Sequence, residues 1–368
     1  MKRARIIHVA EVALSEETGM GRVAVHWRGA CEARGHEFIH IGPAEVGGVA
    51  HPAFFPRAAR RAALALGGAP DLFLVHEPAS GAFVGCGVRT VVFSHGLERR
   101  GWELQRAGHA DWSDRPGLKT RLLFPLWRLR PAERGLRAAD AALLINSEDA
   151  SFAASRYGLS GARNFVFRNG VKRMEEAGES LSGARFTVLF LGTWIPRKGT
   201  QTLARAAEEL HRSGVEVAWI LAGTGRSASE VLADWPEELH GATTVLPHFA
   251  AAEEAELLRQ AHVLVLPSFF EGQPLALLQA MEAGLCCITT DCCGQRDLIR
   301  HGENGLLHAP GDFSALTRLL GECARDENRR RELGQAARLS VAARTWESVS
   351  ADVALQLDAV MEGGRFTR

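Results

Sequence analysis

Short apolar runs, each long enough for one buried strand, recur along the chain with helical stretches between them. The runs with this pattern are Arg5–Ala10, Phe38–Ile41, Leu72–Val75, Thr90–Ser94, Ala141–Ile145, Phe186–Leu191, Val217–Leu221, His262–Leu266 and Cys286–Thr290. Strands that alternate with helices form parallel sheets that are covered by helices. We therefore expect a protein of the α/β class, built from doubly wound Rossmann-like sheets.

A chain of 368 residues is too long for one ordinary hydrophobic core. The polar stretch 172–183 separates the two groups of strands, so we expect one domain over residues 1–173 and a second over residues 184–345. Ligands bind such sheets at the carboxyl ends of the strands. The loops that we expect to meet at one cleft between the domains are 19–21, 95–96, 192–199, 223–226 and 267–275.

The composition excludes several classes of protein. Basic and acidic residues number 43 each, and we expect no nucleic-acid partner. The seven cysteines are scattered or adjacent, which is not the pattern of a secreted disulfide framework. No apolar run reaches 18 residues, and the first one ends at Glu11, so it predicts a strand rather than a signal peptide. These features favour a cytoplasmic location.

Two motifs resemble metal sites, and we interpret both as structural. His36 to His40 reads HExxH, the pattern of zinc proteases, which requires both histidines on one helix face. Here the motif lies between Gly35 and Gly42, where only a short strand fits. The pairs Cys286-Cys287 and Cys292-Cys293 lack the usual spacing of zinc ligands and are expected to be core residues.

Three loops of the second half carry the chemistry of an anion site. A glycine, Gly192, ends one strand, and Lys198-Gly199 precedes the next helix, so the lysine and the helix N-terminus can attract one diphosphate. Gly223-x-Gly225 follows the next strand and permits close approach of a ligand. In Pro267–Gly284, Glu271 precedes a helix expected over Pro274–Ala283, on which Gln279 lies seven residues after Gly272 and is expected to face the same cleft.

Together these segments resemble the family 4 glycosyltransferases, which are retaining enzymes of the GT-B fold. The likeness covers nearly the whole chain. The segments that carry it are Gly19–Arg34 with Gly35-His36-Glu37, Asn169-Gly170-Val171, Phe190–Gly199, Pro267–Gly284, His301–Leu307 and Thr345-Trp346-Glu347. The resemblance implies two domains that face across a cleft, the first binding the acceptor and the second the nucleotide-sugar. It also implies that residues 346–368 form a helix that returns to the first domain.

The resemblance implies a role for each matching residue. Lys198 would bind the donor diphosphate, Glu271 the hydroxyls of the donor sugar, and His95 would be the active-site histidine of the first domain. The further donor-binding positions that it implies are Gly19, Gly21, Thr193, Arg197, Gly223, Gly225, His248, Phe249, Gly272, Gln273, Leu275 and Gln279. The family needs no metal and no cofactor besides the nucleotide-sugar, so we expect a metal-independent, hexosyltransferase-like enzyme of polysaccharide biosynthesis.

Two positions depart from the family pattern. Thr193 stands where the family usually has the first cation of the diphosphate loop, and Arg197 or Arg226 could supply that charge. Gln279 replaces the second glutamate of the family's E-x7-E pair. These departures leave two alternatives open: a non-catalytic protein that binds a sugar nucleotide, and a nucleotide-sugar epimerase of the same fold.

Residues 97–137 mix basic and apolar side chains, with ten arginines and lysines against five acids. The aromatic residues and leucines interleaved with them are Trp102, Trp112, Phe124, Trp127, Leu122, Leu123, Leu126 and Leu129, close to Lys119, Arg121, Arg128 and Arg130. This mix suits a helix at an anionic membrane surface. One hypothesis is peripheral contact with the inner face of the membrane and a glycan or lipid-linked acceptor. The other is a helical hairpin that packs on its own domain.

Overall fold

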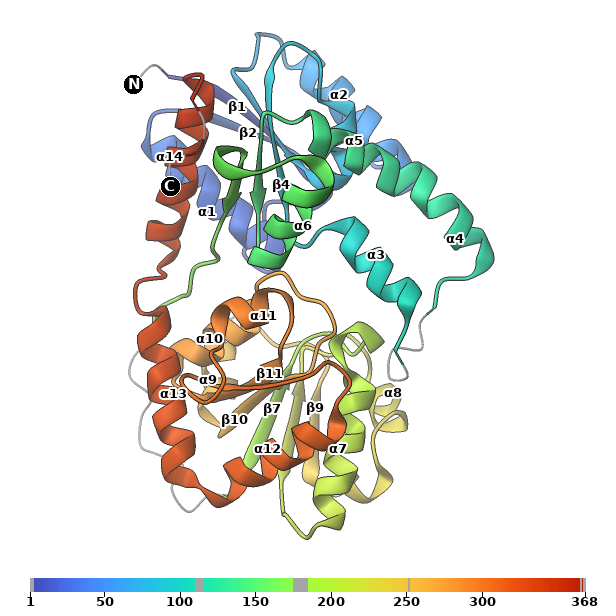
Figure 1. Cartoon of the computed structure of the whole chain (residues 1–368), viewed down its shortest axis with the longest axis vertical. Helices are drawn as coiled ribbons and strands as arrows, with labels where there is room; N and C mark the ends of the chain where they lie inside the picture. Colours follow the sequence, from blue (N-terminus) through green and yellow to red (C-terminus); the bar gives the residue numbers. More distant parts are fainter. Residues whose placement is uncertain (1–2, 110–114, 175–184, 251, 365, 367–368) are drawn as a thin grey trace. The chain divides into compact units, whose positions relative to one another are not determined.

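The computed structural model describes residues 3–109, 115–174, 185–250, 252–364 and 366, and it divides into two units (Figure 1). The first unit comprises Met1–Glu103, Pro116–Gly170 and Trp346–Arg368, and the second comprises Leu104–Arg115 and Val171–Thr345. The sequence does not predict that Leu104–Arg115 groups with the second unit. Most of the expected linker, at 175–184, lies outside the described residues.

The first unit contains a six-stranded parallel sheet in the order β2-β1-β3-β4-β5-β6. Its strands are β1 (Arg5–Val9), β2 (Glu37–Ile41), β3 (Leu72–His76), β4 (Arg89–Ser94), β5 (Ala141–Leu144) and β6 (Asn164–Val166). Its helices are α1 (Gly19–Ala33), α2 (Phe55–Ala65), α3 (Glu98–Ala107), α4 (Leu118–Phe124), α5 (Arg130–Ala138), α6 (Ser147–Tyr157) and α14 (Trp346–Met361). All residues of β3 and β5 are buried, as expected for central parallel strands.

The second unit contains another six-stranded parallel sheet, in the order β12-β11-β10-β7-β8-β9. Its strands are β7 (Thr187–Leu191), β8 (Ala218–Ala222), β9 (Thr243–Leu246), β10 (Val263–Leu266), β11 (Cys286–Thr290) and β12 (Leu306–His308). Its helices are α7 (Thr200–Arg212), α8 (Ala228–Ala233), α9 (Glu254–Arg259), α10 (Leu275–Glu282), α11 (Cys293–Leu298), α12 (Phe313–Arg325) and α13 (Glu327–Val341). This confirms the expected fold class of two doubly wound Rossmann-like sheets.

Both interpretations of the metal-like motifs as structural elements agree with the coordinates. The HExxH segment forms strand β2, whose residues pair with β1. Cys286 and Cys287 lie on β11 and are buried among the apolar side chains of the second unit's core. In the described part of the chain, no three His, Cys, Asp or Glu side chains are grouped so that they could hold a metal ion.

Each sheet has a topological switch point, where the strand order reverses. In the second unit this point lies between β7 and β10, which are neighbours in the sheet but not in the sequence. In the first unit it lies between β1 and β3. Loops diverge to opposite faces of the sheet at such a point and leave a crevice at the carboxyl ends of the strands. Ligands are therefore expected at the loops after β7 and β10 in the second unit, and at those after β1 and β3 in the first.

A buried carboxylate joins α14 to the start of β2. Asp358 accepts hydrogen bonds from Arg34, whose Nε lies 2.6 Å from Oδ2, and its Oδ1 lies 2.7 Å from Nε2 of His36. The side chains of Asp358 and His36 are both buried, and Arg34 is partly covered. Since α14 also packs along α1, this polar contact fixes the last helix to the first unit.

We expect Asp358→Ala to weaken the docking of α14. Removing one partner of a buried ion pair leaves the remaining charge uncompensated and costs about 3 kcal/mol. The measurement is native-state hydrogen exchange of the α14 amides, because the chain has two units and a single unfolding free energy is not defined for it. The control is Asp352→Ala on the exposed side of the same helix. Equal protection of α14 in both variants would contradict the role given to Asp358.

Candidate active site

Three loops of the second unit converge at its switch point. A methyl group added to Gly192, after β7, would lie 3.8 Å from Nζ of Lys198. One added to Gly223, after β8, would lie 3.8 Å from the backbone N of Gly192 and 3.1 Å from the ring of Phe249. The bare backbone of these glycines therefore lies close to a lysine, a backbone amide and an aromatic ring, which are groups that a nucleoside diphosphate needs.

Lys198 and Glu271 form an ion pair in this space. Nζ of Lys198 lies 2.5 Å from Oε1 of Glu271, and Arg197 Nη1 lies 3.6 Å from the same oxygen. Glu271 is 7% exposed. Burial by itself would raise the pKa of this carboxyl, but the two cations outweigh it and hold the pKa below its usual value. Glu271 is thus an ionised carboxylate at neutral pH, poised to accept hydrogen bonds.

Arg197 is the arginine that joins this group. Arg197 lies in the short helix Pro196–Lys198, and its Nη1 donates a hydrogen bond to the backbone oxygen of Phe270 at 2.5 Å. Arg226 instead lies 4.0 Å from Asp234, and both of these side chains are about half exposed. Thr193 packs its methyl group beside Gly225, 3.2 Å from where a Cβ there would lie. Of the two arginines considered as replacements for the cation missing at 193, Arg197 is the one beside Lys198 and Glu271.

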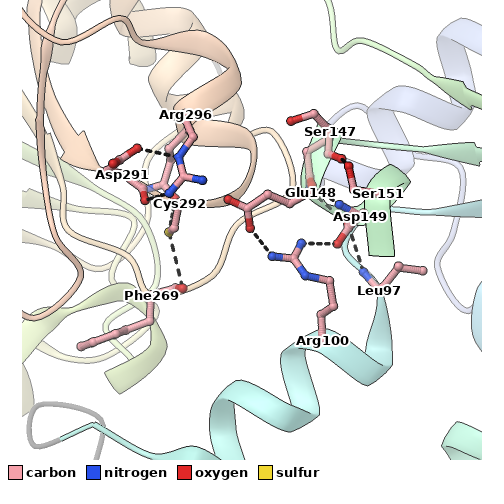
Figure 2. Close-up of polar contacts among 12 residues, drawn as sticks. Leu97, Arg100, Ser147, Glu148, Asp149, Ser151, Phe269, Asp291, Cys292 and Arg296 are labelled. Carbon is pink, nitrogen blue, oxygen red and sulfur yellow. Dashed lines mark hydrogen bonds and ion pairs between the residues drawn. The ribbon is translucent and has the colours of Figure 1, made fainter. Parts of the chain in front are cut away.

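The loop that carries Glu271 is held by the first turn of α11. Sγ of Cys292 lies 3.7 Å from the carbonyl oxygen of Ser268 and 3.6 Å from that of Phe269, and Figure 2 shows the second contact. Gly294 N donates to Glu271 O at 3.4 Å, and a Cβ on Gly294 would meet Gly272 O at 1.5 Å. A side chain at 294 would therefore push the loop away.

Gln295 joins α11 to the ends of β10 and β11, the strands on either side of this loop. It is fully buried, and its Nε2 donates to Leu266 O, Thr289 Oγ1 and Thr290 Oγ1 at 3.2, 2.6 and 2.8 Å. Sequence analysis did not identify this residue or Cys292 as part of the site. The available signal was a polar Gln that follows a Cys-Cys-Gly segment five residues after a strand, a pattern that an exposed loop would also show.

The helix after the loop begins one residue later than expected. Leu275 is its first residue and Pro274 is the N-cap, with extended backbone. Gly272 therefore precedes the helix, and its seven-residue spacing from Gln279 does not place the two on one helix face, which corrects the spacing argument. Gln279 is buried on α10. Gln273 is also buried, and its Oε1 accepts from Arg344 Nη1 at 3.4 Å.

His248 and Phe249, two of the expected donor-binding residues, differ in how far they are exposed. Phe249 is half-buried and packs against the core of the second unit, next to Gly223. His248 is exposed. Phe249 is thus the residue of this pair whose ring borders the space between the glycine loops.

The first unit places a helix N-terminus at its own switch point. α1 begins at Gly19, and its N-cap Thr18 accepts a hydrogen bond from Gly21 N at 3.2 Å. A Cβ on Gly21 would lie 2.5 Å from Thr18 Oγ1 and 2.6 Å from the Ser15 carbonyl oxygen, so this turn is closed around a bare glycine. The geometry gives α1 an exposed positive end, which attracts anions.

His95 follows β4 in a setting of aromatic rings. Its imidazole lies 6.3 Å from the ring of Trp27, 5.8 Å from Phe93, 5.5 Å from Phe167 and 6.0 Å from His76, centroid to centroid. Burial lowers its pKa to about 4, so the ring is neutral at physiological pH. Among the described residues no group donates to or accepts from this imidazole. Its position therefore depends on ring packing and on the backbone that carries it.

Comparison with known proteins finds a family that matches part of this chain. Residues 185–326, all in the second unit, match the family described as Glycosyl transferases group 1. The matched segment is 142 of the 368 residues. A lipopolysaccharide 1,6-galactosyltransferase of Salmonella typhimurium is 47% identical over 55 residues, which are 15% of this chain and 15% of that protein. The match to this relative thus spans a small part of its length.

Solved glycosyltransferase structures have the fold of the whole chain. Sucrose-phosphate synthase from Thermosynechococcus elongatus superimposes with a TM-score of 0.77 at 17% identity, covering 98% of this chain and all of that one. WaaG, a glycosyltransferase involved in lipopolysaccharide biosynthesis, gives 0.72 at 15% identity, with 98% and 100% covered. These likenesses establish the GT-B fold, and the resemblance inferred from the sequence motifs is confirmed.

Gly199 ties the Lys198 loop to the Glu271 loop. Its φ is +73°, and a Cβ there would lie 2.0 Å from the carbonyl oxygen of Pro267. We expect Gly199→Ala to displace both loops and to weaken binding of a nucleoside diphosphate at least about tenfold, a loss of about 1.4 kcal/mol. Isothermal titration calorimetry measures this.

The matched control is Gly214→Ala. Gly214 has nearly the same backbone, with φ +78°, but a Cβ there would meet nothing within 4 Å. Both variants therefore carry the same backbone strain, and only Gly199→Ala carries the clash. Comparable nucleotide affinity in the two variants would show that the loop contact does not shape the site.

Proposed function

We propose that this chain transfers a sugar from a nucleotide-sugar to a glycan or lipid-linked acceptor, with retention of anomeric configuration and without a catalytic metal ion. The observation that carries the proposal is the buried ion pair of Lys198 and Glu271 beside the open glycine loops. It places one cation and one carboxylate, each with a distinct task, at the switch point of the second sheet.

Lys198 is assigned to the leaving group. As the bond between the sugar and the diphosphate breaks, negative charge develops on the diphosphate, and a fixed cation stabilises that charge more than it stabilises the intact donor. The amides at the start of α7, which begins at Thr200, add positive potential from the same side. Before the donor binds, Glu271 compensates the lysine, so the cation is not left unpaired in a buried site.

Glu271 is assigned to the donor sugar. When the diphosphate takes over Lys198, the carboxylate is freed to accept hydrogen bonds from sugar hydroxyls, and charge-assisted bonds of this kind are roughly twice as strong as neutral ones. In the donor-free protein Lys198 and Arg197 hold the pKa of Glu271 below its usual value, so the donor meets an ionised carboxylate. His95, with its neutral imidazole, is assigned to the reacting end of the sugar on the first unit.

The relatives suggest the class of acceptor. Both the Salmonella protein and WaaG are described as acting in lipopolysaccharide synthesis. We infer that the acceptor of this chain is a cell-envelope glycan or its lipid-linked precursor. The donor is identified by a panel of UDP-, GDP-, ADP- and dTDP-sugars in a thermal-shift assay.

Lys198→Ala is expected to fold and to lose activity. Removing one positioned donor of charge stabilisation should reduce kcat by about 10² to 10³. Steady-state transfer with the donor chosen by the thermal-shift panel measures this, and the control is Lys172→Ala, an exposed lysine. Glu271→Ala should also lose turnover while it keeps affinity for the free nucleoside diphosphate.

Product analysis separates the proposal from its alternatives. An epimerase would convert the donor when no acceptor is present, and a non-catalytic binding protein would neither hydrolyse nor transfer it. Near-normal turnover of Lys198→Ala, or the absence of any turnover in the wild-type protein with all four donor classes, would contradict the assignment.

We further propose that the α4 patch, defined as Leu118, Leu122, Leu123 and Leu126, contacts an anionic membrane. These four leucines are 77%, 71%, 45% and 50% exposed. Lys119 and Arg121, on the same stretch, are exposed as well. Exposed apolar side chains next to cations are the pattern of a helix that lies in the headgroup region.

The structure changes the list of residues that could take part. Trp102 and Leu129 are buried and belong to the interior of the first unit, so this part of the expected surface is wrong. Trp112 lies outside the described residues. The helices of the described residues include none with the length and apolarity of a membrane span. Any contact through α4 would therefore be peripheral.

We expect the protein to float with anionic vesicles at low salt, and Leu122→Asp to reduce that binding about tenfold or more. Burying one leucine contributes about 1.5–3 kcal/mol, and the new charge would repel the anionic surface. The control is Leu339→Asp on α13, because Leu339 is also 71% exposed. No flotation of the wild-type protein, or an equal loss in both variants, would remove this idea.

A further inference from the structure

A second buried carboxylate, Glu77, lies at the switch point of the first sheet. It directly follows β3 and is 1% exposed. No lysine or arginine among the described residues forms an ion pair with it. Buried carboxylates are normally paired with a cation, so the presence of Glu77 at this position requires an explanation that core packing does not supply.

The hydrogen bonds of Glu77 converge on the segment that carries His95. Its Oε2 accepts from Ser94 Oγ at 2.8 Å and from Glu98 N at 3.1 Å. Ser94 Oγ in turn accepts from Gly96 N at 3.3 Å. The carboxyl therefore holds the residue before His95, the residue after it, and the first turn of α3.

A second buried carboxylate, Asp149, also binds the start of α3, but unlike Glu77 it is paired with a cation. Asp149 Oδ2 accepts from Leu97 N at 3.2 Å, and Arg100 bridges Asp149 and Glu148 (Figure 2). Asp149 thus has a cation, whereas Glu77 has only a hydroxyl and an amide. The adjacent amides of residues 97 and 98 are each bound to a different buried acid, which leaves this turn little freedom.

The surroundings of Glu77 disfavour its ionised form. Burial raises the pKa of Glu77 to about 8, and the charges of Glu98 on α3 and Asp149 on α6 act in the same direction, while the hydrogen bonds from Ser94 and from the Glu98 amide oppose this rise. The charge of Glu77 raises the pKa of Tyr157 on α6 in turn. The nearby cations are already paired with other acids, Arg128 with Glu98 and Arg100 with Asp149. The carboxyl is therefore largely protonated at pH 7 and ionises as the pH passes about 8.

We propose that Glu77 is a positioning residue for His95: through Ser94 and the first turn of α3 it fixes the short turn that presents the imidazole. The proposal rests on the function assigned to His95 above. It follows from two facts together, since His95 makes no side-chain hydrogen bond among the described residues and its backbone is bracketed by the contacts of Glu77. A neutral carboxyl fits this task, because its oxygen still accepts both hydrogen bonds and it avoids the repulsion from the charges of Glu98 and Asp149.

The first test is a double-mutant cycle on kcat. Glu77→Ala should lower kcat about 10²-fold, the scale expected when a reacting group is misplaced by about 1 Å. It should leave nucleoside diphosphate affinity within about twofold, because the residues of that site belong to the second unit. If Glu77 acts through His95, the variant Glu77→Ala with His95→Ala should be no slower than His95→Ala alone. A further loss of similar size in the double variant overturns the proposal.

The second test is the pH profile of kcat. Wild-type kcat should fall about tenfold or more between pH 7 and pH 9.5, following one ionisation near pH 8. Glu77→Gln keeps the length and a neutral acceptor oxygen, so it should retain most of the activity at pH 7 and stay flat up to pH 9.5. The control is Glu32→Gln, an exposed carboxylate on α1, which should titrate like the wild-type protein. A fall with pH in Glu77→Gln equal to that of the wild type overturns the proposal.

A readout independent of transfer separates this proposal from the proposed function. In ¹⁵N-histidine NMR spectra, Glu77→Ala should shift or broaden the imidazole signals of His95, and Glu77→Gln should leave them in place. Wild-type protein that transfers no sugar but shows this pattern would contradict the function and retain the positioning role. Active protein in which Glu77→Ala leaves the His95 signals unchanged would do the reverse.

Discussion

Parallel pairing of every strand is the constraint on which the rest of this structure depends. Because all strands of a sheet run the same way, their carboxyl ends gather at one edge, and the chain must cross back to the other edge before each next strand, ten times over the two sheets of the described residues. Glycines at 192, 199, 223 and 225 allow the turns of the second unit to approach one another closely. The same requirement that shapes the turns also leaves backbone amides and helix N-termini facing open space.

Glu271 and Glu77, which lie at the switch points of the two sheets, are buried in opposite electrostatic surroundings. In the second, Glu271 lies beside Lys198 and Arg197, which keep its pKa low and the group charged. In the first, Glu77 has no such cation, and burial raises its pKa to about 8. The physical difference is the sign of the nearest charges. A charged acid suits the recognition of sugar hydroxyls, whereas a neutral one suits the support of a turn that must not be pulled toward neighbouring acids.

The departures from the family pattern have structural counterparts. Thr193 brings no charge to the diphosphate loop, and Arg197 lies beside Lys198, 3.6 Å from Glu271.

Cys293 is the one non-glycine residue with positive φ in the described chain. Its φ is +51°, and it lies in the turn that supports the Glu271 loop. Backbone in this region is strained for a residue with a side chain, and strain of this kind persists only where surrounding contacts fix it. Here the contacts of Cys292 and Gly294 with the loop, and of Gln295 with the end of β10, provide that fixation.

The sequence by itself determined the fold class, the order of the central strands' apolar runs, the glycine turns and the lysine of the anion site. It missed β6, β9 and β12, and all three are edge strands. An edge strand is covered less completely, so it carries no continuous apolar run that a pattern can detect. Only the tertiary structure decided which polar groups meet: Lys198 with Glu271, Arg34 and His36 with Asp358, and Glu77 with Ser94. These partners are 17 to 324 residues apart in the chain, and the free energy of a buried charge depends on its neighbours in space, which spacing along the sequence does not encode.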